Sequence, residues 1–362
     1  MLVESLSVLD FRNLREGPVE LSEGLNLIFG DNGQGKTNFL EAVSVCATGR
    51  SPRTRQDREM IRFERAEAHL CVQILRPETG RRDRIDVHLR KDGKKGLAVN
   101  GLGLKKSGEL FGLLHTVSFA PGDLLLIQGG PSLRRRFLDL ELCQLSRVYV
   151  NALQQYYHVL KQRNALLKTM RFRPADRELL PAFDEQLAYF AARLCRSRSA
   201  FVAELDTEAR AAHAQLSGNR EELSIEYRQS CTPEELPEKL AHSLDRDVAL
   251  GQTGYGPHRD DLVFWLNGQE ARVYGSQGQQ RTAALSAKLA ELSLIRNRLG
   301  EDPVLLLDDV LSELDTHRQQ ALWETAGQVQ TLLTCTAADK QVLRAVPKRA
   351  FLVKDGVFLR QI

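Results

Sequence analysis

Alternation of apolar and polar side chains marks much of the first hundred residues and predicts β-strands. Residues 2–9 alternate loosely, and residues 68–100 hold three runs in which every second side chain is apolar. The segments 77–80 and 91–94, which separate these runs, contain Pro, Gly or Asp and favour tight turns. We therefore expect an opening strand followed by an antiparallel meander.

The period lengthens to that of an α-helix from about residue 134. Apolar residues recur at intervals of three and four on both sides of a break at Arg173 and Pro174. They are Leu138, Leu142, Leu145, Tyr149, Ala152, Tyr156 and Leu160, then Phe183, Leu187, Phe190, Leu194, Phe201 and Leu205. We expect two helices of about 30 residues, roughly 45 Å each at 1.5 Å per residue, packed as a hairpin. The polar stretch 217–250 is consistent with a return of the chain toward the first domain.

A glycine-rich segment stands between a short apolar run at residues 25–29 and a helical pattern at residues 38–48. Its residues are Gly30, Asp31, Asn32, Gly33, Gln34, Gly35, Lys36 and Thr37, which fit the phosphate-binding loop pattern. Glycines let the backbone turn its N–H groups inward and approach a polyphosphate closely. Lys36 would reach the outer phosphates and Thr37 would hold Mg²⁺, while the helix points its positive end at the anion. The segment predicts binding of ATP or GTP, with a chance glycine turn as the alternative.

A second nucleotide motif ends the apolar run Val304 to Asp309, which predicts a strand followed by two carboxylates. Asp308 would hold Mg²⁺ through water, and Asp309 would orient the attacking water as a general base. Taken alone, the run would fit a buried strand entering a polar turn equally well. With the phosphate-binding loop present, Asp308, Asp309 and Lys36 become the candidate catalytic residues.

A third motif, formed by Ser276, Gln277, Gly278 and Gln279, opens a helical pattern that continues to Ile295. A serine hydroxyl and the free N–H groups of a helix start make a second anion site. One nucleotide needs only one phosphate loop. We therefore expect two copies of the chain to face each other, each supplying this segment to the nucleotide held by the other.

Charge is nearly balanced, with a formal net charge of +3 over 362 residues, so a surface for nucleic acid has to come from local clusters. The candidate DNA contacts are Arg50, Arg53, Arg55, Arg58, Lys105, Lys106, Arg134, Arg135 and Arg136. A solvated loop is the alternative for residues 50–65, and salt bridges at a helix start are the alternative for residues 134–136.

Cysteine spacing and hydropathy indicate the compartment. The six cysteines show no C-x-x-C pair, which argues against zinc and a disulfide framework and suits a reducing cytoplasm. No apolar run approaches the roughly 20 residues that cross a bilayer, and residues 1–5 lack a signal-peptide pattern. We expect a cytoplasmic protein without a membrane segment.

The motifs together resemble the ABC-type ATPase head that SMC and related DNA-repair proteins share. GDNGQGKT, SQGQ, LLLDD and the segment Ser312-Glu313-Leu314-Asp315 carry this resemblance. More specific segments are DFRNL at residues 10–14, GPHRDDL at residues 256–262, GSQGQQRTAALSAKLAE and LLLDDVLSELD. They resemble the RecF family of bacterial recombination mediators over nearly the full length.

The resemblance implies an α/β fold with an ABC-type P-loop ATPase head that combines a mixed sheet with the meander. Residues 1–130 and 250–362 would form this head, and residues 131–249 would form an inserted, mostly helical arm. Residues 276–279 would act as the signature segment across an ATP-dependent homodimer, and residues 312–315 as the D-loop at its interface. RecF-like proteins bind gapped DNA and single-strand–duplex junctions without sequence preference and hydrolyse ATP slowly with DNA stimulation. They act with RecO and RecR to load RecA in repair, replication-fork maintenance and the SOS response.

Two positions depart from related patterns. Gly122 stands where a glutamate is expected in the family, and Thr334 stands where transporter cassettes carry a histidine, as expected of RecF-like heads. Two other classes fit part of the sequence. A transporter cassette usually lacks so long a helical hairpin, and an SMC-like clamp needs much longer coiled-coil arms or a C-x-x-C hook.

Overall fold

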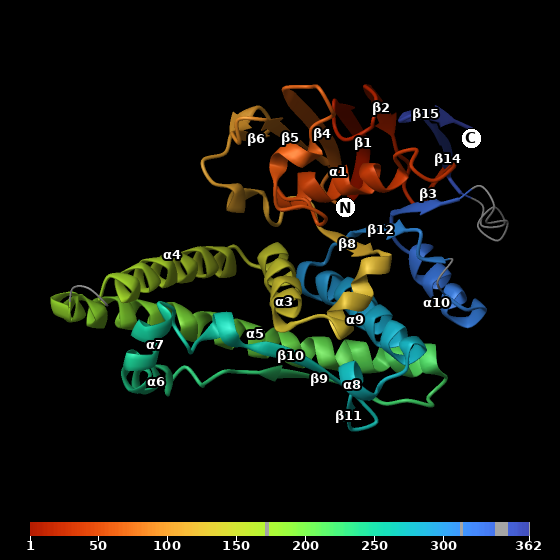
Figure 1. The fold of residues 1–362 in the computed structure, drawn as a ribbon. Helices are drawn as coiled ribbons and strands as arrows, with labels where there is room; N and C mark the ends of the chain where they lie inside the picture. The colour runs from red at the N-terminus through yellow and green to blue at the C-terminus, as the bar shows by residue number, and fades with distance from the viewer. Residues whose placement is uncertain (171–173, 312–313, 337–346, 362) are drawn as a thin grey trace. The chain divides into compact units, whose positions relative to one another are not determined.

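The computed structural model describes residues 1–361 except 171–173, 312–313 and 337–346 (Figure 1). The chain forms two compact units, unit 1 with residues 1–123 and 291–362 and unit 2 with residues 124–290. The helical arm expected at residues 131–249 thus lies within a unit that extends to residue 290. The reason is that a strand at Asp261–Leu266 pairs with a strand at Leu223–Arg228.

The first sheet of unit 1 is antiparallel, in the order β2-β1-β4-β5-β6-β7. Its strands are β1 (Leu2–Leu9), β2 (Gly17–Glu20), β4 (Glu67–Arg76), β5 (Arg81–Arg90), β6 (Lys95–Val99) and β7 (Leu102–Gly103). Leu70 pairs with Val87 and Val72 with Ile85, and all four side chains are fully buried. The predicted opening strand and meander are therefore confirmed.

The second sheet of unit 1 is mixed, in the order β15-β14-β3-β13-β12-β8. It contains β3 (Leu25–Phe29), β8 (Thr116–Phe119), β12 (Val304–Asp308), β13 (Thr331–Cys335), β14 (Arg349–Lys354) and β15 (Val357–Arg360). Only the β14–β15 pair is antiparallel. The strands predicted before the glycine-rich segment and before Asp309 are both present.

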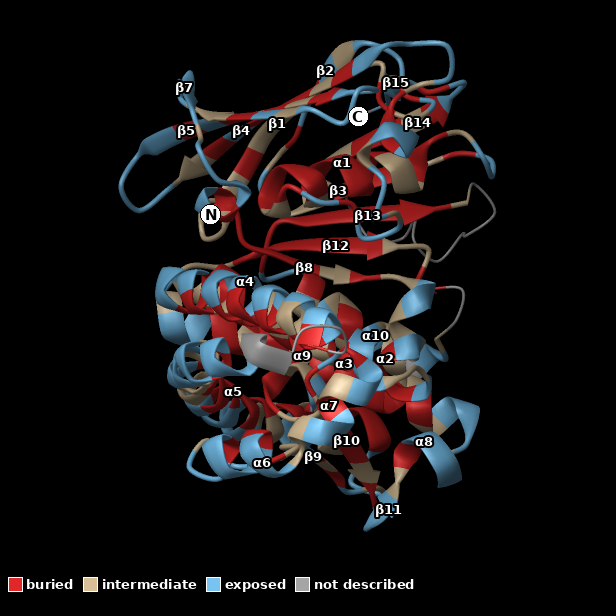
Figure 2. Cartoon of the chain, turned by 60° about the vertical axis from the view of Figure 1, so that its left-hand side comes forward, coloured by how far each residue is buried: buried red, intermediate tan, exposed pale blue. Residues whose placement is uncertain are grey.

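Helix α1 (Lys36–Thr48) lies between the two sheets of unit 1 (Figure 2). Apolar side chains on all its faces, including Phe39, Val43 and Cys46, are buried, as expected of a helix covered on both sides. Gly49 ends the helix in a left-handed conformation with φ 70°. Among its described residues, unit 1 also contains η1 (Asp57–Met60), η2 (Ser107–Leu110), η3 (Pro121–Leu124) at its boundary, and α10 (Thr316–Ala326).

Helices dominate unit 2, where α4 (Arg147–Met170) and α5 (Leu180–Ser217) pack side by side as the predicted hairpin. The first predicted helix is wrong in one respect, because it is divided into α3 (Pro131–Leu145) and α4. Ser146 is extended, and its hydroxyl accepts a hydrogen bond from the Tyr149 amide at 3.2 Å, so it caps α4. The apolar period runs through this position and conceals the break.

The polar stretch 217–250 contains more regular structure than a simple return of the chain. It holds β9 (Leu223–Arg228), α6 (Leu236–His242) and α7 (Leu244–Leu250). The chain continues through η5 (Pro257–Arg259), β10 (Asp261–Leu266), β11 (Gln269–Glu270), α8 (Ala271–Tyr274) and α9 (Gln277–Leu299). Unit 2 also contains η4 (Pro174–Leu179), and α2 (Leu125–Gln128) lies at its start. None of the described helices combines the length and apolar character needed to span a membrane.

Candidate nucleotide-binding site

Three glycines shape the loop between β3 and α1. Gly30, Gly33 and Gly35 have φ values of 148°, 78° and 114°, which other residues rarely adopt. A Cβ atom on Gly30 would lie 2.5 Å from the Val353 carbonyl oxygen, and one on Gly35 would lie 2.7 Å from Leu14 Cδ2. Both the conformation and the close packing therefore require glycine.

Side chains and amides from distant segments hold this loop. Asn13 donates from Nδ2 to the Gly33 carbonyl at 2.8 Å and accepts at Oδ1 from Asn38 at 2.7 Å. The Asp355 amide, in the turn between β14 and β15, donates to Gln34 Oε1 at 2.6 Å. The loop is thus fixed from residues on both sides of it in the sequence. Asn13 had no predicted role beyond marking the DFRNL segment.

Lys36 lies at the loop, as the pattern predicts. Its side chain is 7% exposed, and Nζ donates to the carbonyl oxygens of Gly30 at 2.7 Å and Asp31 at 2.8 Å. A bound phosphate would replace these neutral acceptors with a charged one, which forms the stronger hydrogen bond.

The structure brings Thr37 and Asp308 together across 271 residues of sequence. Thr37 Oγ1 donates to Asp308 Oδ1 at 2.9 Å, and Thr334 Oγ1 donates to the same oxygen at 2.7 Å. Thr334, 1% exposed, also accepts from the Asp309 amide at 3.1 Å, and Asp309 has a left-handed φ of 51°. Hydroxyl and carboxylate oxygens are ligands that Mg²⁺ prefers, so Thr37 and Asp308 fit that ion. In sequence Thr334 is only a departure from transporter cassettes, but its hydroxyl contacts both Asp308 and Asp309.

A buried carboxylate beside the loop organises two arginines. Glu41, 2% exposed, accepts from Arg12 Nε at 3.1 Å and Nη2 at 2.7 Å, from Arg53 Nη1 at 3.2 Å and from Ser51 Oγ at 2.6 Å. Arg53, a candidate DNA contact, is therefore partly committed to Glu41, although half of its side chain is exposed. Nothing in the sequence indicates this role, because the spacing of a single polar residue in a helix does not show whether it is buried.

The predicted signature segment forms a capped helix start in unit 2. Ser276 Oγ accepts from the Gln279 amide at 3.3 Å, and Gln279 Oε1 accepts from the Ser276 amide at 2.8 Å. This reciprocal pair is a capping box. Ser276, Gln277 and Gly278 are exposed. Of the predicted D-loop, Ser312 and Glu313 lie outside the described residues, while Asp315 caps α10 through the Arg318 amide at 3.0 Å.

The basic candidates have different environments. Arg134, 4% exposed, forms two hydrogen bonds with Asp261 at 2.7 and 2.8 Å, and Arg135 donates to the Asp260 carbonyl at 2.7 Å. The exposed candidates are Arg50, Arg53, Arg55, Arg58, Lys105, Lys106 and Arg136. Gly122 is also exposed, in η3. Arg134 thus forms an ion pair with Asp261 at the start of α3. Such a salt bridge was the alternative to a DNA contact expected from the sequence at this residue.

The GPHRDDL segment, residues 256–262, belongs to a cluster in unit 2 that we call the arginine cluster; the cluster also includes the buried Arg163 and Arg198 with their carboxylate partners. Arg198 is fully buried and donates to Asp139 at 2.7 Å, Tyr149 Oη at 2.9 Å and the Pro257 carbonyl at 2.7 Å. Arg163, also fully buried, binds Asp184 at 2.6 Å and Asp247 at 2.9 Å. These contacts join α3, α4, α5 and the segment before β10.

Gly256 and His258 of GPHRDDL each occupy a position whose contacts restrict which residue can stand there. A Cβ on Gly256, at φ 123°, would lie 2.5 Å from Tyr156 Oη. That hydroxyl is 2.7 Å from His258 Nδ1, and His258 Nε2 is 3.0 Å from the Thr253 carbonyl. Burial, with Arg259, Arg135 and Arg163 nearby, lowers the pKa of His258 to about 4. Most of the segment is therefore packed against its neighbours in unit 2, while Arg259 is exposed.

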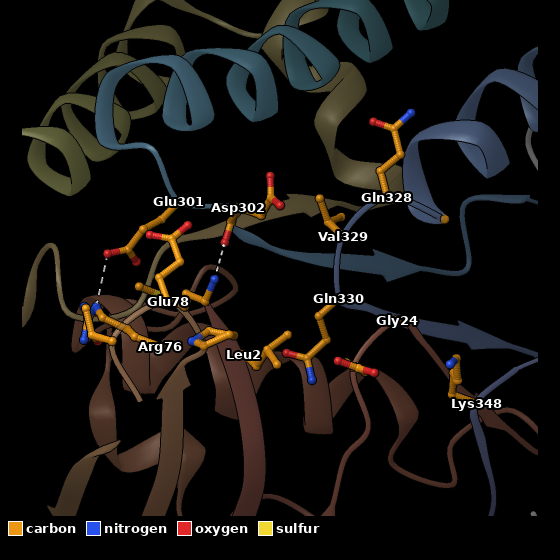
Figure 3. A pocket seen from close by; sticks show the side chains of 15 residues that line it. Leu2, Gly24, Arg76, Glu78, Glu301, Asp302, Gln328, Val329, Gln330 and Lys348 are labelled. Atoms are coloured by element: carbon orange, nitrogen blue, oxygen red, sulfur yellow. Dashed lines mark hydrogen bonds and ion pairs between the residues drawn. The ribbon is translucent and has the colours of Figure 1, made fainter. Parts of the chain in front are cut away.

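A separate cavity of about 440 Å³ lies where the parallel strands of unit 1 begin, away from the phosphate-binding loop (Figure 3). Arg76 Nε lies 3.3 Å from Glu301 Oε1 across it, and the Met1 amine donates to the Asp302 carbonyl at 3.1 Å. Gln330 bonds to the amide and carbonyl of Val3 at 2.7 and 2.8 Å. None of the predicted site residues lines this cavity.

A phosphate-binding loop between a parallel strand and a buried helix, facing a strand that ends in two aspartates, defines a P-loop ATPase head of the ABC class. Residues 5–209 match the family model described as an AAA domain. The DNA replication and repair protein RecF of Lachnoclostridium phytofermentans is 47% identical over 342 residues, covering 94% of each chain. RecF of Lachnospira eligens is 42% identical over 359 residues, covering 98% of each. The chain belongs to the RecF family.

Solved structures agree with this assignment. A structure described as the recombination mediator protein RecF-ATP in the RecFOR pathway has a TM-score of 0.93 and 34% identity, covering 99% of this chain and 97% of that one. An Smc head domain from Pyrococcus furiosus has a TM-score of 0.58 and 16% identity, covering 99% and 95%. The second likeness shows the SMC-type head fold alone.

Proposed function

We propose that the protein is a cytoplasmic, ATP-binding recombination mediator with weak, DNA-dependent ATPase activity. The observation that carries the proposal is the meeting of Thr37 and Asp308 at 2.9 Å beside the Lys36 ammonium. This arrangement gathers a metal-binding hydroxyl, a carboxylate and a phosphate-binding cation in one place. The RecF-ATP relative supports ATP over GTP.

The residues of the site have distinct roles in the proposed hydrolysis. The amides of residues 30–37 and Lys36 bind the phosphates, and Thr37 and Asp308 hold Mg²⁺, which when bound would neutralise charge on the phosphates. Asp309 orients the attacking water as general base. The Ser276 to Gln279 segment meets the nucleotide of a second copy, so closure requires an ATP-dependent homodimer.

DNA binding is proposed at exposed basic residues rather than at Arg134. The exposed candidates are Arg50, Arg53, Arg55, Arg58, Lys105, Lys106 and Arg136. Arg53 also binds Glu41, and the half-buried Arg135 donates to the Asp260 carbonyl. Contacts to backbone phosphates make the affinity sequence-independent and strongly salt-dependent. The RecFOR pathway named for the structural relative supports action with RecO and RecR, and through them RecA loading at gapped DNA.

The test is the ATP hydrolysis rate of the purified protein, alone and with gapped duplex DNA, at low and moderate salt. We expect DNA to stimulate hydrolysis and salt to weaken the stimulation. Lys36→Ala should abolish ATP binding and nucleotide-driven dimerisation, whereas Asp309→Asn should bind ATP and accumulate as a dimer because hydrolysis stops.

Ser276→Arg separates the dimer proposal from nucleotide binding. It should bind ATP normally but remain monomeric, since the added side chain occupies the exposed helix start. Normal ATP-driven dimerisation of this variant would contradict the signature assignment. Hydrolysis that is indifferent to DNA would contradict the DNA-dependent ATPase and favour an SMC-like clamp with little turnover.

A further inference from the structure

One aromatic ring of unit 1 stands almost entirely in solvent. Phe63 is 88% exposed, although Met60 and Ile61 just before it are buried. It lies in a tight turn closed by a hydrogen bond of 3.1 Å from the Arg65 amide to the Arg62 carbonyl. Glu64 in the same turn has a left-handed φ of 64°, which is uncommon for a residue with a side chain.

Backbone contacts hold this turn in place on both sides. The Arg62 amide donates to the Asp10 carbonyl at 2.7 Å, and the Arg12 amide donates to the Met60 carbonyl at 2.7 Å. Between these bonds, Phe11 and Ile61 form an isolated antiparallel bridge. The ring of Phe63 is therefore presented on a fixed support, which lowers the entropy that a ligand would have to remove.

The surroundings of the ring are charged and mostly positive. Phe63 lines a surface hollow with Arg15, Arg62, Glu64 and Arg65. Arg65 Nε lies 3.3 Å from Asp10 Oδ1. Within the described parts of the chain, no carboxylate forms an ion pair with Arg15 or Arg62. Two arginines beside the ring thus keep their charge available to an anionic ligand.

We propose that Phe63 is a stacking platform for an unpaired base of single-stranded DNA, with Arg15 and Arg62 contacting the adjacent phosphates. Stacking on an exposed aromatic side chain accepts any base, and neighbouring arginines bind the backbone. The core of a protein–protein interface is depleted of charged residues, whereas the other four residues of this hollow are charged. The inference rests on the proposed DNA binding and adds that the single strand of a gap is read at this turn.

The experiment compares DNA binding of the full-length protein, its Phe63→Ala variant and its Phe63→Trp variant in the presence of ATP. The probes are a fluorescein-labelled oligothymidylate, a gapped duplex and a continuous duplex of the same length. Phe63→Ala should bind the oligothymidylate and the gapped duplex about tenfold more weakly, equivalent to about 1.4 kcal/mol. Its affinity for the continuous duplex should equal that of the parent protein. Phe63→Trp should bind like the parent, and the oligothymidylate should quench its added fluorescence.

Leu102→Ala is the matched control, because Leu102 is 75% exposed in the same unit. It should leave all three affinities unchanged. Arg62→Gln should reduce the slope of log affinity against log salt by about one unit, whereas Phe63→Ala should leave this slope unaltered.

The outcomes separate the inference from the proposed function. A parent protein that binds none of the three probes would overturn both. A parent that binds DNA, with Phe63→Ala binding the gapped duplex equally well, would overturn the stacking platform alone and leave the ring as a protein contact. Equal loss on continuous and gapped duplex would also overturn it, because a stacked base has to be unpaired.

Discussion

The phosphate-binding loop and the arginine cluster are both built from unusual polar motifs, yet their chemistry differs. In the loop, Lys36 contacts only neutral carbonyls of Gly30 and Asp31, so its charge has no ionic partner in these contacts. In the cluster, Arg163 and Arg198 are fully buried against carboxylates. A charged side chain that contacts only neutral groups, such as Lys36, can still bind a charged ligand. Buried side chains of opposite charge that pair with each other, as in the arginine cluster, instead stabilise the fold.

Breaking the arginine cluster should give the largest effect on stability. Arg198→Met leaves the Asp139 and Asp260 carboxylates without their buried partner, and we expect a loss of about 3–5 kcal/mol in the free energy of unfolding. Urea denaturation measures this loss. Arg196→Met is the matched control, because Arg196 is exposed on the same helix, and it should change stability by less than about 0.5 kcal/mol. Equal midpoints for the two variants would show that the cluster contributes nothing.

The cluster should also make stability depend on pH through His258. Its pKa is lowered to about 4 in the folded protein by burial, against an ordinary value of 6.5, so the unfolded chain binds the proton more tightly. The stabilisation is therefore complete above pH 6.5 and is lost as the pH falls through 4, by up to about 3 kcal/mol. His258→Gln should show a flatter profile across this window in urea denaturation at several pH values. A profile parallel to that of the parent would contradict the assignment.

The smallest effect is expected at the nucleotide site, where Thr334→Val removes one hydroxyl and keeps the shape. Asp308 Oδ1 loses a donor and the Asp309 amide loses an acceptor, but Thr37 still contacts Asp308. We expect hydrolysis about tenfold slower, equivalent to about 1.4 kcal/mol, with ATP affinity within a factor of about two. Single-turnover kinetics measure the hydrolysis rate, and an equilibrium binding titration measures the ATP affinity. Thr334→Ser restores the hydroxyl and should restore the rate, so a slow Thr334→Ser variant would count against this role.

Local patterns predicted the elements that depend on neighbouring residues. The strand at 25–29, the glycine-rich turn and α1 follow from a contiguous stretch, and the meander follows from alternation with turn residues between its strands. The fold class was predicted because the sequence motifs of ABC-type ATPases occur together. For the same reason, the phosphate-binding loop was expected to share one site with the aspartates at the end of β12.

Contacts between polar side chains that are far apart in the sequence could not be predicted from local patterns. Glu41 gathers Arg12 and Arg53 from two other segments, and nothing in the spacing of these residues distinguishes them from solvated charges. The same holds for Arg134, whose partner Asp261 lies 127 residues further along the chain. The division at Ser146 was hidden because a single polar residue within an amphipathic pattern resembles the polar face of one continuous helix.

The strand order of the mixed sheet has a consequence for how the protein is made. Among the described strands, β3 pairs with β13 and β14 alone, so a ribosome synthesises about 300 further residues before either neighbour exists. At about 5–20 residues per second, this delay is roughly 15–60 s. During that time neither of these two neighbouring strands is available to pair with β3. The nucleotide site is thus completed only once Asp308 has been synthesised, 271 residues after Thr37.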